Sequence, residues 1–313
     1  MSREADAYLT TVLDLMEENA LLSRRVDWPA VRAEARERAA GARTPGDTHS
    51  AIEAALGSLG DGHSFLVRPD AAAEVFHAPL VGGAGPQGRS LPGGFAHLTL
   101  PGAPNSEEGQ AAYVREGRDA VREAAEGGAC GWVVDLRENR GGNMWAPLAV
   151  VAGLLGDGEV GAFVDADGRR SPWVIEEGGV LVDGDVLGPA QPVLPAMPPV
   201  AVLTSSETAS AGEAVAIAFR GRPDTRTFGR PTFGVPTSNY PHELPDGAVL
   251  VLTRAREADR TGRVYPHDQP LPPDEETRGG RAALQAATDW LASHPRCRET
   301  TSGRPPDRWS AHR

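Results

Sequence analysis

The stretch of sequence that decides the fold is VAVLTSSETASAGEAVAIAF, which runs from Val200 to Phe219. It opens with a short apolar run of the kind found in buried parallel strands. A turn rich in Ser and Thr follows, and an apolar helix begins at about Ala209 or Ser210. Ser210 is therefore expected near the N-terminus of a buried helix, at the carboxyl end of a strand, where α/β proteins usually place ligand groups.

A hydroxyl at this place has two interpretations. Ser and Thr at a strand-to-helix boundary are usually helix caps and nothing more. The free N–H groups of the first helical turn, starting with that of Ala211, would also point at anything bound beside the Ser210 hydroxyl, and could form half of an oxyanion hole. The segment alone leaves both interpretations open, and capping is the commoner of the two.

Strands and helices alternate on both sides of this segment, which predicts an α/β core with at least partly parallel strands. Before it, apolar spacing predicts helices, with Leu9, Val12 and Met16 on one face and Asp27 as the cap of the next helix. The predicted organisation is an N-terminal helical bundle over 1–58, a core over 59–294 and a polar, Arg- and Pro-rich disordered tail over 295–313. Further strands are expected at 95–100, 132–136, 161–166, 173–177, 225–229 and 248–257, and further helices at 105–128, 145–155 and 280–292.

The composition excludes several kinds of chemistry. Among the 313 residues all 31 basic side chains are Arg, and there is no Lys. The chain therefore cannot form a Schiff base, has no phosphate-binding loop with its Lys, and has no Ser–Lys catalytic dyad. A formal charge of −12 argues against nonspecific binding to nucleic acid or to an anionic membrane.

The two cysteines, Cys130 and Cys297, lie far apart in the sequence and form no CxxC motif or Cys/His cluster. Neither a disulfide framework nor a zinc site is predicted, and no other cofactor is indicated. The N-terminal segment carries acids and lacks an apolar run, and no later stretch reaches about 18 apolar residues. These features predict no signal peptide, no membrane span and a cytoplasmic location.

Two other segments carry candidate site residues. VDLRENRGGNM (Val134–Met144) is a strand end followed by Gly141 and Gly142, a pair that lets backbone approach a ligand closely. LGDGHSFL (Leu59–Leu66) places His63 after a tight turn. Because Lys is absent, His63 is the leading candidate to deprotonate Ser210 near neutral pH. Taken alone, a glycine pair is an ordinary turn and a loop histidine is more often structural or at the surface.

Together the three segments resemble the tail-specific (C-terminal processing) serine peptidases, a family that includes the tricorn protease core. The matching runs are DLRENRGG (Asp135–Gly142), TASAGE (Thr208–Glu213) and FGRPTFGVPTSN (Phe228–Asn239). The resemblance covers roughly 57–274. It implies a ClpP/crotonase-like mixed sheet core with helices, and the N-terminal helices suit family members that carry a helical cap.

The chain departs from the processing peptidases at two points. Where they place a Lys general base, this chain has Val235, and it has no room for their PDZ domain before Asp135. The tricorn-like branch instead uses a His from a D-G-H-[ST] turn, which Asp61–Ser64 matches. The resemblance therefore implies a compact His-type member without a PDZ domain, similar to the branch that contains nisin-resistance proteins.

The resemblance implies a role for each candidate residue. Ser210 would be the nucleophile and His63 the general base, while the N–H of Ala211 and one from the pair Gly141 and Gly142 would bind the oxyanion. Glu213, three residues after Ser210, ranks first as the group that orients His63, ahead of Asp268 and Asp61. Asn143 and Met144 are candidate substrate-groove residues. His242 and His267 are interpreted as surface residues.

The function expected from these residues is that of a serine endopeptidase acting on peptides or on unstructured or C-terminal segments. Its partner would be a peptide or protein substrate, with no nucleic acid and no membrane. Two alternatives remain open: a noncatalytic module that binds peptides or hydrophobic ligands on the same fold, and a small-ester hydrolase that uses the same dyad. A Ser210 hydroxyl beyond hydrogen-bond reach of His63 would favour the binding module.

Overall fold

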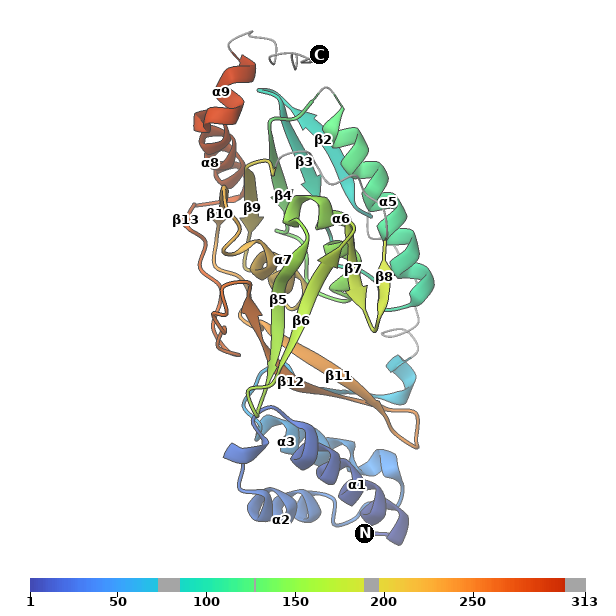
Figure 1. Ribbon diagram of the computed structural model, residues 1–313. Helices are drawn as coiled ribbons and strands as arrows, with labels where there is room; N and C mark the ends of the chain where they lie inside the picture. Colours follow the sequence, from blue (N-terminus) through green and yellow to red (C-terminus); the bar gives the residue numbers. More distant parts are fainter. Residues whose placement is uncertain (73–84, 127, 189–196, 302–313) are drawn as a thin grey trace.

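The computed structural model describes residues 1–72, 85–126, 128–188 and 197–301. Figure 1 shows a helical end that contains the N-terminus, a middle layer of long strands and an α/β layer that contains the C-terminal helices. No helix within the described ranges is long and apolar enough to span a bilayer.

The helical end is formed by the N-terminal residues. Ser2 and Asp27 cap its first two helices by accepting hydrogen bonds from Ala5 N and Ala30 N, so the predicted Asp27 cap is confirmed. The buried face of the helices shares one apolar core with Leu250 and Leu252 of a sheet strand. The helices and turns are α1 (Arg3–Asn19), η1 (Ser23–Arg25), α2 (Trp28–Arg38), η2 (Pro45–Thr48) and α3 (His49–Gly57).

The α/β layer is built on a mixed sheet with the strand order β13-β10-β9-β4-β3-β2. All neighbouring strands in it are parallel except β2 and β3. This confirms the predicted mixed α/β fold with partly parallel pairing. Its strands are β2 (Gln87–Leu91), β3 (Phe95–Thr99), β4 (Gly131–Asp135), β9 (Val200–Thr204), β10 (Thr225–Gly229) and β13 (Glu275–Glu276).

The middle layer is an antiparallel sheet in which the long strand β12 joins the helical end to the rest of the molecule. On one side β12 pairs with β11, and on the other with β1 near its start and β5 near its end. The strands are β1 (Phe65–Val67), β5 (Gly158–Asp165), β6 (Arg170–Glu176), β7 (Gly179–Val182), β8 (Asp185–Leu187), β11 (Thr237–Glu243) and β12 (Val249–Asp259).

The helices of the core differ in how apolar they are because they are covered to different extents. Every residue of α7 (Ala211–Phe219) is buried, as is α6 (Trp145–Leu155) beyond its first residue. Both helices contact strands of the antiparallel sheet, and α7 also contacts β9 of the mixed sheet. A helix covered on all sides must be apolar all round. The amphipathic helices α5 (Glu107–Ala125) and α8 (Gly280–Ser293) lie at the outside.

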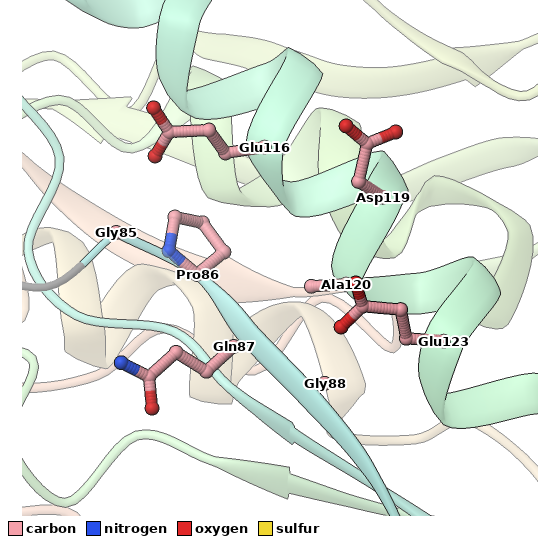
Figure 2. A pocket seen from close by; sticks show the side chains of 8 residues that line it. All are labelled: Gly85, Pro86, Gln87, Gly88, Glu116, Asp119, Ala120 and Glu123. Atoms are coloured by element: carbon pink, nitrogen blue, oxygen red, sulfur yellow. The ribbon is translucent and has the colours of Figure 1, made fainter.

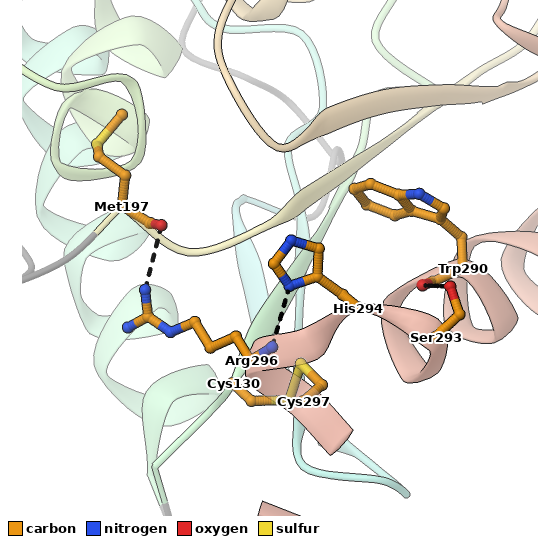
Figure 3. The surroundings of a disulfide bond; sticks show 7 residues. All are labelled: Cys130, Met197, Trp290, Ser293, His294, Arg296 and Cys297. Carbon is orange, nitrogen blue, oxygen red and sulfur yellow. Dashed lines mark hydrogen bonds between the residues drawn. A yellow bond between two sulfur atoms is a disulfide. The ribbon is translucent and has the colours of Figure 1, made fainter. Parts of the chain in front are cut away.

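The C-terminal segment differs from its prediction in two ways. Pro295–Thr301 form the helix α9, so the tail predicted to be disordered from residue 295 begins with a helix, while residues 302–313 lie outside the described residues. Cys297 in α9 forms a disulfide with Cys130, which directly precedes β4 (Figure 3). The prediction of no disulfide was wrong because the fold brings together two cysteines with a sequence separation of 167. Both cysteines lie in the apolar cluster between α8 and the mixed sheet.

Candidate active site

The two motif turns predicted from the sequence lie side by side at one edge of the mixed sheet. Strands β4 and β9 are adjacent and parallel, with Asp135 opposite Leu203, so both carboxyl ends meet there. The turn after β9 is tied to the turn after β4: Thr208 Oγ1 donates to Leu136 O at 2.8 Å, and Ala209 N donates to Asn139 O at 3.0 Å. The fold therefore brings Ser210 and the glycine pair into one place.

Ser210 occupies the position that directly precedes α7, and its backbone is strained. Its φ of 50° and ψ of −116° lie outside the regions that non-glycine residues usually adopt. Such strain persists only where the surroundings impose it, and it concentrates at functional sites. Gly141 is close enough that a Cβ there would lie 3.1 Å from Ser210 Cβ and 3.6 Å from Ser210 Oγ. The Ser210 side chain thus faces the backbone of the glycine pair.

Asn139 gives the glycine turn its shape. Its side chain is fully buried; Oδ1 accepts a hydrogen bond from Gly141 N at 3.1 Å, and Nδ2 donates to Leu100 O and Pro101 O at 3.2 Å each. The Gly141 N–H is therefore already occupied. Across the described ranges, the N–H groups of Gly142 and Ala211 donate to no protein group. These two are the donors left free to bind a developing oxyanion.

Glu213 is hydrogen-bonded to the Ser210 backbone and not to the His63 ring. It is fully buried in α7, and its Oε2 accepts hydrogen bonds from Ser210 N at 3.0 Å and Val235 N at 2.9 Å. Its Oε1 accepts from Gly234 N and from Thr232 Oγ1. Burial raises the pKa of the Glu213 carboxyl, although these hydrogen bonds oppose the shift. Glu213 thus joins Ser210 to the turn that carries Val235.

His63 lies at the antiparallel sheet, just before β1, and is half-buried. Its N–H donates to Asp61 Oδ1 at 3.0 Å, and its ring Nδ1 is 2.7 Å from Thr237 Oγ1. Burial lowers the pKa of the His63 imidazole to about 4, and the Asp61 carboxylate opposes this shift. The ring is therefore neutral at physiological pH. In the described part of the chain, no hydrogen bond joins Ser210 Oγ to the His63 ring.

The other acids considered for orienting His63 have different surroundings. Asp61 shapes the local turn, because its Oδ1 accepts from the N–H groups of His63 and Ser64 and its Oδ2 from Ser64 Oγ. Asp268 is exposed and makes no hydrogen bond or ion pair with the described residues. Neither carboxylate is hydrogen-bonded to the histidine ring.

The two predicted substrate-groove residues have structural contacts of their own. Asn143 Oδ1 accepts hydrogen bonds from Trp145 N at 2.9 Å and Ala146 N at 3.1 Å, which caps the start of α6. Met144 is buried in the core beneath. Contact of either residue with substrate stays a prediction.

The structure places two further residues, which the sequence interpretation missed, beside the candidate site residues His63 and Glu213. Thr237, at the start of β11, is the residue that contacts the His63 ring, and it lies in the quoted run FGRPTFGVPTSN. Glu257 on β12 is fully buried, and its Oε2 has no hydrogen-bond partner among the described residues. Burial raises the pKa of Glu257 well above its ordinary value, and the nearby Glu213 carboxylate adds to the shift. Strand alternation marks Glu257 as inward-facing, but nothing local in the sequence marks Thr237.

A separate surface groove lies between β2 and α5, and its α5 wall is acidic, while its β2 wall is uncharged (Figure 2). It shares no residue with the turns around Ser210. The lining residues are Gly85, Pro86, Gln87, Gly88, Glu116, Asp119, Ala120 and Glu123. Among the described residues, no group of three or more His, Cys, Asp or Glu side chains is arranged so that it could hold a metal ion.

Comparison with solved structures supports the fold described above. A lipoprotein from Streptococcus agalactiae superposes with a TM-score of 0.80 at 23% identity, covering 94% of this chain and 98% of that one. The photosystem II D1 C-terminal processing protease superposes with a TM-score of 0.63 at 16% identity, covering 91% of this chain and 98% of that one. At these identities the likeness is one of fold.

Comparison of sequences identifies the family as well as the fold. The nisin-resistance protein of Lactococcus lactis subsp. lactis is 24% identical over 91% of this chain and 86% of its own length. The chloroplastic carboxyl-terminal-processing peptidase 2 of Arabidopsis thaliana is 29% identical over 50% of this chain but only 30% of its own length. The family model of peptidase family S41 matches residues 105–277, more than half of the chain, a range that includes Ser210 and the glycine pair but not His63. The chain therefore belongs to peptidase family S41 and is a serine peptidase.

Proposed function

We propose that this chain is an endopeptidase that cleaves peptides or unstructured or C-terminal segments, with Ser210 as nucleophile and His63 as general base. One observation carries the proposal: Ser210 has a strained backbone at the N-terminus of α7, packs against Gly141, and lies at a turn where the N–H groups of Ala211 and Gly142 bond to none of the described residues. This arrangement is suited to acyl transfer, in which a hydroxyl attacks and two N–H groups receive the oxyanion.

In the proposed reaction, Ser210 Oγ attacks the peptide carbonyl carbon while His63 Nε2 takes the hydroxyl proton. Nε2 is the available ring nitrogen because Nδ1 is occupied by Thr237. The tetrahedral intermediate collapses, the C–N bond breaks, and the imidazolium returns the proton to the leaving amine. Water, deprotonated by His63, then hydrolyses the ester of Ser210 and releases the second product.

The proposal requires that substrate binding bring the hydroxyl and the imidazole together. Catalytic hydrogen bonds are often long in ligand-free enzymes and tighten only in the substrate complex. The two groups already belong to one connected unit, since Ser210 N and Val235 N donate to the same oxygen of Glu213 and Thr237 follows Val235 closely in the chain. Completion of the site would then require the two layers to move relative to each other when substrate binds.

The substrate class is proposed from the names of the relatives. Two are C-terminal processing peptidases, and the relative that matches along most of the chain is named for resistance to nisin. We therefore propose a flexible peptide with an accessible backbone as substrate, and include both nisin and unstructured C-terminal peptides in its test.

The first test is labelling by a fluorophosphonate, which reacts with an activated serine. We expect labelling of the wild type at Ser210 and loss of labelling and peptide cleavage in Ser210→Ala and His63→Ala. Matched controls are Ser206→Ala, an exposed hydroxyl in the same turn, and His267→Ala, a partly exposed histidine outside the site; both should keep activity. Full activity of His63→Ala would overturn the proposed mechanism.

Two other results would point to the alternative functions. Peptide binding with no turnover and no labelling would indicate a binding module. Turnover confined to small esters, with every peptide in the panel left intact, would indicate an ester hydrolase. Mass spectrometry of the products of a peptide library distinguishes these outcomes and gives the cleaved bonds directly.

A further inference from the structure

We propose that Thr237 is the positioning residue for His63: its hydroxyl holds ring nitrogen Nδ1 and thereby keeps Nε2 available for Ser210. The inference rests on the proposed Ser–His mechanism and adds a residue to it. The contact is short, 2.7 Å from His63 Nδ1 to Thr237 Oγ1, and the Thr237 side chain is buried. A buried, well-formed hydrogen bond fixes the plane of an imidazole more firmly than an exposed one.

Both partners of this contact are held by the backbone around them. The N–H of His63 donates to Asp61 and its carbonyl oxygen accepts from Asn239 Nδ2 at 3.0 Å, so the peptide units on either side of the ring are fixed. The N–H of Thr237 donates to Val235 O at 2.8 Å, and Thr237 pairs with Arg256 in the β11–β12 ladder. A β-branched side chain has few rotamers, so the position of the Thr237 hydroxyl follows from its strand.

No carboxylate in the described part of the chain competes for this role. Both oxygens of Asp61 are hydrogen-bonded within the turn that carries His63. Both oxygens of Glu213 are hydrogen-bonded to the nucleophile segment and to the turn at Val235. Thr237 Oγ1 is the group that meets the ring, and it makes no other hydrogen bond to the described residues.

A hydroxyl in this position acts differently from the carboxylate of a Ser–His–Asp triad. A carboxylate only accepts, so it stabilises the imidazolium by charge as well as by orientation. A hydroxyl can donate to Nδ1 or accept from it, so the Thr237 contact survives in either tautomer and in the imidazolium. In the tautomer that the mechanism requires, Nδ1–H donates to Thr237 Oγ1 and Nε2 carries the lone pair that takes the Ser210 proton. Thr237 therefore sets the direction of the ring and adds no charge to it. The His63 ring is half-buried and has no carboxylate at Nδ1 to stabilise its charged form, which is consistent with its low pKa.

The test is a series of substitutions at Thr237 measured beside His63→Ala. Val keeps the shape of Thr and its preference for strands but lacks the hydroxyl, so in Thr237→Val we expect kcat to fall about 5- to 10-fold, the effect of losing one hydrogen bond, with KM unchanged. Thr237→Ser keeps the hydroxyl and should retain most of the wild-type kcat. The rate of fluorophosphonate labelling of Ser210 should follow kcat. If the Val variant does not fold, Thr237→Ala replaces it in the same comparison.

The outcomes separate this inference from the proposed function. Wild-type kcat in Thr237→Val, with His63→Ala inactive, overturns the role of Thr237 and leaves the Ser–His mechanism standing. An equal loss in the Val and Ser variants also overturns it, because the branched shape and not the hydroxyl would then matter. Activity that survives in His63→Ala overturns the proposed function itself, whatever the Thr237 variants do. Loss in Val with recovery in Ser supports the inference.

Discussion

The disulfide between Cys130 and Cys297 should stabilise the fold without contributing to catalysis. The bond closes a loop with a sequence separation of 167 residues, and it joins the start of β4 to α9. The predicted site lies at the opposite end of the same strand, after Asp135. Removing the bond should therefore lower the free energy of unfolding and leave kcat unchanged at temperatures where the protein is folded.

The size of the effect follows from the length of the loop. For a loop of this length, the entropy lost by the unfolded chain corresponds to about 5 kcal/mol at 25 °C, while natural disulfides commonly contribute about 2–5 kcal/mol. With an unfolding entropy of roughly 2 cal/mol/K per residue over 313 residues, a loss of 5 kcal/mol lowers Tm by about 8 °C.

The assay compares thermal unfolding of the oxidised protein, the reduced protein and the variant Cys130→Ala/Cys297→Ala. Alanine suits both positions because each cysteine is buried among apolar side chains. The reduced protein and the double variant should melt at similar, lower temperatures, and reductant should leave the double variant unaffected. Equal Tm values for verified oxidised and reduced protein would refute the reasoning. Two reactive thiols in unreduced, denatured protein would show that the bond does not form at all.

The same bond bears on the predicted cytoplasmic location. Structural disulfides are rare in the reducing cytosol and common in oxidising compartments. We therefore propose that a chain isolated with this bond intact had folded in an oxidising compartment. Trapping free thiols by alkylation before lysis tests this directly, since a cytosolic chain would carry both cysteines alkylated.

Three further predictions concern the site and the core beneath it. The acidic limb of the pH profile of kcat/KM should lie near pH 4, the value to which burial lowers the pKa of His63; a limb near the ordinary histidine value of about 6.5 would contradict the role of this residue as base. Glu257→Gln should become more stable than the wild type as the pH rises. The folded-state pKa of Glu257 is raised, so its contribution to stability is fully present below the unfolded pKa of about 4.3 and is lost as the pH rises through the folded-state pKa. Urea unfolding at several pH values measures this. The same dependence of the free energy of unfolding on pH in the wild type and in Glu257→Gln would contradict it. Gly212→Ala should lower kcat and destabilise the fold by about 1–3 kcal/mol, because the added Cβ would lie 2.5 Å from Asn139 O in the glycine turn. The control Gly57→Ala adds a Cβ to open space in α3 and should be neutral or stabilising by up to about 1 kcal/mol; equal effects of the two substitutions would disprove the packing argument.

The parts of the structure that could be predicted from the sequence are those set by local patterns. The strand and helix around Ser210 are fully buried and apolar, which makes both easy to recognise. The adjacency of the two motif turns follows from parallel strands, whose carboxyl ends share one edge. The partners of Glu213 could not be predicted in this way, because helix periodicity gives the face of a side chain but not the segment that packs on it. The disulfide was missed for a related reason, since sequence separation carries no information on which segments meet in space.

Val235 occupies the position at which the processing peptidases carry a Lys general base, and its turn connects the two sheets. Val235 makes its hydrogen bonds through its backbone: its N–H donates to Glu213 Oε2, and its carbonyl oxygen accepts from Thr237 N. The segment therefore links α7, which carries Ser210 at its start, to β11, whose first residue contacts His63. A base carried on this turn would keep its position relative to Ser210 through Glu213 and through the hydrogen bond from Phe233 N to Thr208 O. A base at His63 belongs to the antiparallel sheet, so its distance from Ser210 depends on how the two layers sit against each other. Thr237 belongs to the same antiparallel sheet as His63, so substitutions there change the orientation of the base within its own layer. Activity in the proposed mechanism should respond to these substitutions although both Ser210 and His63 are left in place.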